Sequence, residues 1–166
     1  MGTALITCSS ILYCVMYLKA QSARLRELEL ICSMLEITGA ELAARLTPLP
    51  ELAELLEGRM AEPAKSFYSK LKGGMAALGE RSFYSIWSLC VSESFKRLSA
   101  DELQMLTELG GSLGRYDIDR QLKAIDVCTE VFRTSVERSA REQPDRKKLH
   151  IGLALSTAAM LVVILL

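Results

Sequence analysis

The sequence has little of what catalytic and metal-binding sites usually need. His150 is the only histidine, and it lies near the C-terminus. A two-histidine metal site and a histidine-based catalytic triad are therefore both excluded. The glycine-rich stretch 110–114 follows no strand pattern and precedes no Gly-Lys-Ser/Thr, so it is not a phosphate-binding loop. We expect no catalytic residue, no metal site and no cofactor.

Cysteine pairs and an excess of positive charge are also missing. The five cysteines are odd in number and form no Cys-x-x-Cys pair, so we expect reduced thiols in place of a disulfide framework. Twenty Lys and Arg balance twenty Asp and Glu. Without a surplus of positive charge the chain has no electrostatic footprint for phosphates, and we expect no nucleic-acid partner.

Charged side chains are absent from both ends of the chain. Residues 1–18 and 149–166 contain no Asp, Glu, Lys or Arg. A helix of eighteen residues is about 27 Å long, close to the hydrocarbon thickness of a bilayer. We predict a transmembrane helix in each segment. The alternative for the first segment is a cleaved signal peptide, although no basic residue precedes its apolar run. The alternative for the second segment is a buried core helix.

Basic residues beside the two predicted spans give the expected topology. These residues are Lys19, Arg24, Arg26, Arg146, Lys147 and Lys148. Positively charged flanks stay on the cytoplasmic side of a membrane. We therefore predict a cytosolic domain from 19 to 148, with both termini on the far side.

The middle of the chain has the spacing of helices and no convincing strand. Leu25, Leu28, Cys32 and Leu35 recur at steps of three and four residues. This period predicts that the first span continues as one helix to about residue 46.

Proline and glycine positions predict where the next helices begin and end. Thr47 is suited to cap a helix with Pro48 in its first position, and another helix is expected to begin at Pro63. Gly58 and the pair Gly73-Gly74 are expected to end these two helices.

Another helix is predicted from 82 to 98, with Trp87 as its core anchor. Ser99 and Glu102 then match a capping box, in which each side chain binds the other residue's backbone N–H. A further helix is therefore expected to begin after Ser99.

The glycines Gly110, Gly111 and Gly114 are expected to break that helix. Asp117 is suited to cap a long amphipathic helix after the break. A joint is expected at Gln143-Pro144-Asp145, before the tail helix, because a residue preceding proline disfavours helical geometry. The fold class predicted for the middle is therefore all-α.

Several short elements occur in an order that resembles a known family. The elements are Glu41, Thr47-Pro48-Leu49-Pro50-Glu51, the aromatic stretch from Ser82 to Trp87, Leu113-Gly114-Arg115-Tyr116-Asp117, Gln121 and Ile125. With a charge-free segment at each end, this layout resembles stage III sporulation protein AB of endospore-forming bacteria. That family is related to the inner-membrane platform proteins of type II secretion and type IV pilus systems.

The resemblance implies an antiparallel helix bundle with an assembly role and no catalysis. It places the chain in the mother-cell membrane around the forespore, in the complex that links the two cells. The implied partners are a cytosolic secretion-type ATPase and other membrane components of that complex. Gly152 and Ser156 form a small-xxx-small pair, which is compatible with a homo-oligomer.

The residues expected to contact a partner or to shape these motifs are Glu41, Thr47, Pro48, Pro50, Glu51, Trp87, Gly114, Asp117 and Gln121. Caps and turns are the competing explanation for most of them. A tail-anchored helical adaptor that binds a partner helix, with no secretion machine, is the alternative function. A secretion ATPase gene directly upstream would favour the platform role.

Overall fold

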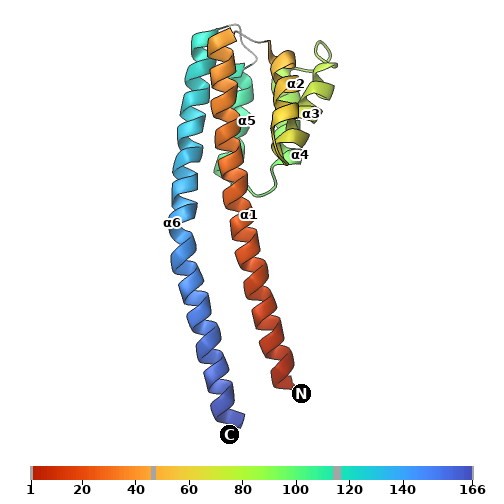
Figure 1. Ribbon diagram of the computed structural model, residues 1–166. Coiled ribbons are helices and arrows are strands. Elements are labelled where there is room, and N and C mark those ends of the chain that lie inside the picture. The colour runs from red at the N-terminus through yellow and green to blue at the C-terminus, as the bar shows by residue number, and fades with distance from the viewer. Residues whose placement is uncertain (1, 46–47, 114–116, 166) are drawn as a thin grey trace. The chain divides into compact units, whose positions relative to one another are not determined.

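The computed structural model describes the backbone of residues 2–45, 48–113 and 117–165. Side chains are described for residues 16–17, 19–44, 48–113 and 117–141. The six helices of this part of the chain are α1 (Gly2–Arg45), α2 (Leu49–Arg59), α3 (Ala64–Met75), α4 (Phe83–Ser94), α5 (Ala100–Leu113) and α6 (Ile118–Leu165) (Figure 1). Over these residues the only extended pairing is an isolated bridge between Leu78 and Arg81, so the all-α prediction is confirmed.

The chain divides into two compact units. One consists of Arg26–Ser135, and the other of Met1–Leu25 together with Val136–Leu166. We call the first the bundle unit, and the description below concerns this unit. The domain boundaries expected from the sequence, 19 and 148, remain a prediction.

No helix was found long and apolar enough to cross a membrane within the part of the chain whose side chains are described. The two predicted spans, 1–18 and 149–166, lie outside that part except for Met16 and Tyr17.

The core of the bundle unit is centred on Phe67 of α3. Its ring lies 5.0 Å from Tyr68, 4.9 Å from Trp87 and 5.4 Å from Phe95, measured between ring centroids. Helix α2 packs on α3, α3 on α4, and α4 on α5. Trp87 is 3% exposed and donates its indole N–H to the Leu106 carbonyl at 2.7 Å, which confirms it as the anchor between α4 and α5.

The break predicted at Gly110 and Gly111 is wrong, and the end of α3 predicted at Gly73-Gly74 is one residue early. Helix α3 continues through Gly73-Gly74 to Met75, and α5 continues through Gly110 and Gly111 to Leu113. A Cβ at Gly74 would lie 2.5 Å from Ile86 Cγ2, and one at Gly110 would lie 2.5 Å from Trp87 Cγ. These two glycines lack a side chain and so let neighbouring helices approach closely. At Gly110 the sequence-based prediction interpreted the glycine as the end of a helix.

Helix starts agree better with the predictions than helix ends. The Ser99 amide donates to Glu102 Oε2 at 2.7 Å and the Glu102 amide to Ser99 Oγ at 3.3 Å, so the capping box is confirmed. Pro48 occupies the N-cap position of α2 and not its first helical position. Helix α4 ends at Ser94, short of the expected 98, and the chain turns away at Phe95.

The two longest helices are the first and the last of those described. Helix α1 is unbroken from Gly2 to Arg45, so the predicted continuation through Gly39 is confirmed. Helix α6 is unbroken from Ile118 to Leu165, so the joint predicted at Gln143-Pro144-Asp145 is wrong. Within the bundle unit the end of α1 and the start of α6 lie side by side and run in opposite directions (Figure 1).

Candidate functional site

Three of the motif residues, Glu41, Asp117 and Gln121, lie toward the end of the bundle unit where α1 ends and α6 begins. Ala43 near the end of α1 and Leu122 near the start of α6 line one groove. Glu41 is half-buried on α1 and forms an ion pair with Arg59 at the end of α2, with 3.7 Å between Oε1 and Nη1. Gln121, one turn into α6, is buried at 6% exposure.

Helix-start chemistry accounts for several of these residues. Asp117 Oδ1 accepts from the Arg120 amide at 3.2 Å, so Asp117 caps α6 as predicted. Its other oxygen lies 2.9 Å from the Arg120 guanidinium. Pro48, Pro50 and Glu51 form the exposed first turn of α2. Such caps and turns stabilise helix ends without needing a partner.

Other predicted residues divide between the interior, the surface and the part not described. Trp87 is buried and therefore serves the core. Lys19 and Arg26 are exposed, and Arg24 is half-buried. The residues whose side chains lie outside the described part are Thr47, Gly114, Arg146, Lys147 and Lys148.

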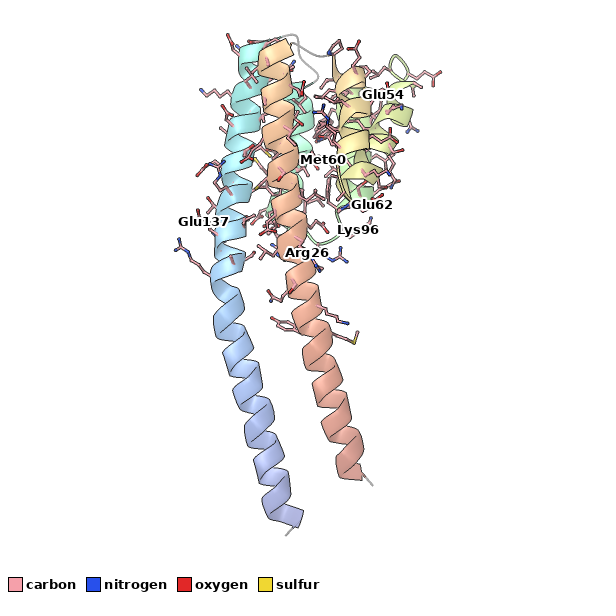
Figure 2. The ribbon with its side chains drawn as sticks, viewed as in Figure 1. Arg26, Glu54, Met60, Glu62, Lys96 and Glu137 are labelled. Carbon is pink, nitrogen blue, oxygen red and sulfur yellow. The ribbon has the colours of Figure 1, made fainter. Side chains whose placement is uncertain are left out.

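A buried carboxylate on α1 was missed by sequence reasoning. Glu27 is only 3% exposed. Its Oε1 accepts from the Arg97 backbone N–H and its Oε2 from the Arg97 guanidinium, each at 3.1 Å. Arg26 and Lys96, the chain neighbours of these two residues, are labelled in Figure 2. The pair ties α1 to the connection between α4 and α5.

The sequence held a signal for Glu27. It stands four residues, about one helical turn, before Ile31. It therefore lies on the same face of α1 as the buried residues Ile31, Met34 and Leu35. A carboxylate at a core position of a helix needs a hydrogen-bonding or charged partner. That partner, Arg97, is seventy residues away in the sequence and no local pattern identifies it.

A second buried polar contact links α1 to α3. The Thr38 hydroxyl donates to the Met34 carbonyl at 2.7 Å and lies 3.1 Å from the Tyr68 hydroxyl. Burial raises the pKa of Tyr68 above its ordinary value. Tyr68 is therefore a neutral phenol that satisfies its hydrogen bond inside the core.

Two grooves border α6 in the bundle unit. The groove between α1 and α6 has a volume of about 510 Å³ and is lined by Leu35, Glu36, Gly39, Ala40, Ala43, Leu122, Ile125, Asp126, Thr129, Glu130 and Arg133. The groove between α5 and α6 has a volume of about 330 Å³ and is lined by Met105, Glu108, Leu109, Ser112, Arg120, Lys123, Ala124, Val127 and Cys128. Apolar floors with charged rims suit protein helices better than small polar substrates.

The thiols of the bundle unit are poor nucleophiles. Burial raises the pKa of Cys32 to about 11 and that of Cys128 to about 12. Both are therefore protonated at neutral pH, whereas the thiolate is the reactive form. Over the described residues, no group of three or more His, Cys, Asp or Glu is placed to hold a metal ion.

Comparisons with known proteins agree on one family. A solved structure titled "Stage III sporulation protein AB (SpoIIIAB)" superimposes with a TM-score of 0.65 at 21% sequence identity, covering 74% of this chain and 98% of that chain. That likeness supports the fold. A comparison with curated proteins finds no match. The family described as "Stage III sporulation protein AB" matches residues 1–166. Because the match spans the whole chain, the protein belongs to the stage III sporulation protein AB family.

Proposed function

We propose that this sporulation protein is a non-catalytic membrane platform in the channel complex between mother cell and forespore. In this role it couples a cytosolic secretion-type ATPase to the membrane components of the complex. The observation that carries the proposal is the continuity of α1 and α6. Each helix belongs to the bundle unit at one end and extends into a charge-free segment, 2–18 or 149–165, at the other.

The membrane attachment rests on those two segments. Eighteen residues without a formal charge match the thickness of a bilayer, and basic side chains stand on the inner flank of each segment. The bundle unit then lies in the mother-cell cytosol, where an ATPase reaches it. The segment boundaries of this proposal are 1–18, 19–148 and 149–166.

The contacts of the bundle unit suit mechanical coupling. Near the point where α1 leaves the unit, Glu27 is bound to Arg97 of the α4–α5 connection. Near the point where α6 leaves it, Arg133 is bound to Glu36 of α1, with 2.8 Å between nitrogen and oxygen. A partner that shifts α4 or α5 would act on α1 through the first contact and on α6 through the second. Such transmission requires a partner that binds one arrangement better than another.

The grooves beside α6 favour a second candidate function. A tail-anchored adaptor would bind one amphipathic helix in such a groove and would need no ATPase. The two candidates differ in their partner and in whether both ends are held in the membrane.

Co-purification of the full-length chain from sporulating cells tests the platform role. The tagged protein should float with membranes in a density gradient and should retain a secretion-type ATPase after mild detergent extraction. Recovery of the chain in the soluble fraction without detergent would overturn the membrane attachment. Floating chains that never retain the ATPase would favour the adaptor.

A variant of the Glu27–Arg97 pair tests the coupling itself. Glu27→Gln keeps a carbonyl oxygen that can accept from the Arg97 backbone N–H and loses the charge that binds its guanidinium. We expect this variant to retain the ATPase but to lower the yield of heat-resistant spores. Glu54→Gln, which changes an exposed carboxylate on α2, is the matched control and should sporulate normally. Equal sporulation of the two variants would show that the pair does not transmit motion.

A further inference from the structure

We infer that the groove between α5 and α6 is a contact surface for a second copy of this chain. This inference does not rest on the ATPase: it concerns how copies of the bundle unit meet. The residues that carry it are Met105 and Glu108 on the α5 wall, and Lys123 and Val127 on the α6 wall.

The groove has an apolar end that is open to solvent. Val127 is 52% exposed, although its neighbours Ile125 and Cys128 on α6 are buried in the core. Beside it, Met105 is half-buried, and Leu109 and Cys128 form a buried floor. Covering this end would remove apolar surface from water and would stabilise a complex.

The two walls carry opposite charges. Glu108 is exposed on α5, where its carboxylate accepts a hydrogen bond from the side-chain amide of Gln104 at 2.8 Å. Arg120 and Lys123 are exposed on α6. Arg120 is engaged with Asp117, whereas Lys123 forms no ion pair within the described ranges. The α5 wall can therefore bind a cationic side chain through Glu108, and the α6 wall can bind a carboxylate through Lys123.

The register of the two helices makes the groove complementary to itself. Helices α5 and α6 are consecutive, line one groove and are joined by only a few residues around 114–116, so they run in opposite directions. Residues equally distant from that connection lie at similar heights. Met105 is thus level with Val127, and Glu108 is level with Lys123.

A two-fold axis along the groove brings α5 of one copy opposite α6 of the other at the same height. Met105 then faces Val127 of the second copy, and Glu108 faces Lys123. Each contact occurs twice, because a two-fold interface uses the same surface on both copies. The result is a four-helix arrangement with an apolar centre and two ion pairs.

The neighbouring groove lacks this property. Between α1 and α6, the charged residues are Glu36, Asp126, Glu130 and Arg133. Arg133 is already bound to Glu36 at 2.8 Å and to Glu130 at 3.4 Å. Two such acid-rich surfaces would repel each other, so charge selects the α5–α6 groove for self-association.

A charge-swap experiment on the full-length chain in detergent tests the inference. Association is measured by energy transfer between copies labelled at the N-terminus, over a range of protein-to-detergent ratios. Glu108→Lys and Lys123→Glu should each weaken association by about tenfold or more, because each reverses both ion pairs of the dimer. The double variant E108K/K123E should restore association, since each new lysine faces a new glutamate.

The matched control is Asp126→Lys. It makes the same charge change as Glu108→Lys, on α6, but lines the other groove. It should leave association unchanged, and circular dichroism should report the same helix content for all four variants. Val127→Asp, which places a charge at the apolar end, should weaken association without affecting the fold.

Three results would overturn the inference: a chain that stays monomeric at every ratio, single variants without effect, or a double variant weaker than either single one. If the single variants instead lose another protein from the co-purified complex while the chain stays monomeric, the groove serves that protein. Failure of membrane flotation would leave this measurement intact, so the two proposals fail separately.

Discussion

At the scale of single residues, glycines and buried polar groups determine how the helices meet. Gly110 faces the Trp87 indole, and Gly74 faces Ile86, so each lies where two helices approach most closely. Glu27 and Thr38 bring hydrogen-bonding groups into the interior and find their partners on other segments, Arg97 and Tyr68. Each of these residues therefore requires one particular residue of another segment beside it.

Replacing Gly110 by Ala should destabilise the bundle unit. The added Cβ would lie 2.9 Å from Trp87 Cβ and closer still to its ring, and the indole is held by its hydrogen bond to Leu106. We expect a loss of about 1–3 kcal/mol in the free energy of unfolding, measured by urea denaturation. Gly73→Ala is the control: its Cβ would meet nothing within 4 Å, so it should be neutral or stabilising. Equal effects would show that the close approach to Trp87 is unimportant.

The thiols of Cys32, which is half-buried, and Cys128, which is buried, should make the protein sensitive to alkali. Burial raises the pKa of Cys32 from its ordinary 9.0 to about 11, and that of Cys128 to about 12. Above pH 9 the unfolded chain releases these protons while the folded chain keeps them, so stability falls as pH rises. The contribution is complete below pH 9.0 and is lost by about pH 12.

Unfolding midpoints measured between pH 8 and 11 check this expectation. The double variant C32A/C128A should show a flatter decline than the natural sequence, even if its midpoint at pH 8 is lower. Parallel curves for the two proteins would contradict the assignment to these thiols.

At the scale of helices, starts and faces follow local chemistry, whereas ends follow contacts. The capping box at Ser99 and the cap at Asp117 use side chains within three residues of the backbone they satisfy. The end of α5 does not: Gly110 and Gly111 remain helical because α4 packs there. The predicted helix starts therefore agree with the structure, as do the ends of α1 and α2, whereas the end of α4 and the breaks expected at Gly110-Gly111 and at residues 143–145 do not.

Replacing Asp117 by Ala separates a capping role from a contact role. Loss of the Oδ1 acceptor leaves the Arg120 amide without this hydrogen bond and should cost about 1 kcal/mol of stability. Asp119→Ala, in the first turn of the same helix, is the control and should cost less. Thermal unfolding measures stability, and co-purification measures partner retention. Lost partner retention with an unchanged midpoint would identify Asp117 as a contact residue.

At the scale of the whole molecule, the proposed topology determines which residues the cytosol reaches. Cys90 and Cys128 are buried, so labelling them reports on folding and not on topology. Ser92 is exposed on α4 and offers a better position. The variant Ser92→Cys should resist a membrane-impermeant maleimide in intact cells and react after lysis.

The control for that experiment is Gly2→Cys. If both termini lie on the far side of the membrane, the thiol at residue 2 should react in intact, non-sporulating cells that express the chain in their outer cytoplasmic membrane. Labelling at residue 92 before lysis, or protection of residue 2, would contradict the proposed orientation.

The sequence by itself determined the helical class, the continuity of α1, the capped starts of α5 and α6 and the role of Trp87. These features depend on periods of three to four residues and on hydrogen bonds that span about one turn, so neighbouring residues contain the whole signal. Family membership could be recognised for a related reason, because the motifs keep their order along the chain.

Only the tertiary structure decided the rest. The partner of Glu27, the close approaches at Gly74 and Gly110, and the grooves beside α6 each join residues that are far apart in the sequence or on different helices. Which residues meet across a bundle depends on how the helices pack, and many packings share the same local pattern. That Met105 and Glu108 line the same groove as Lys123 and Val127 is therefore evident only in the folded chain.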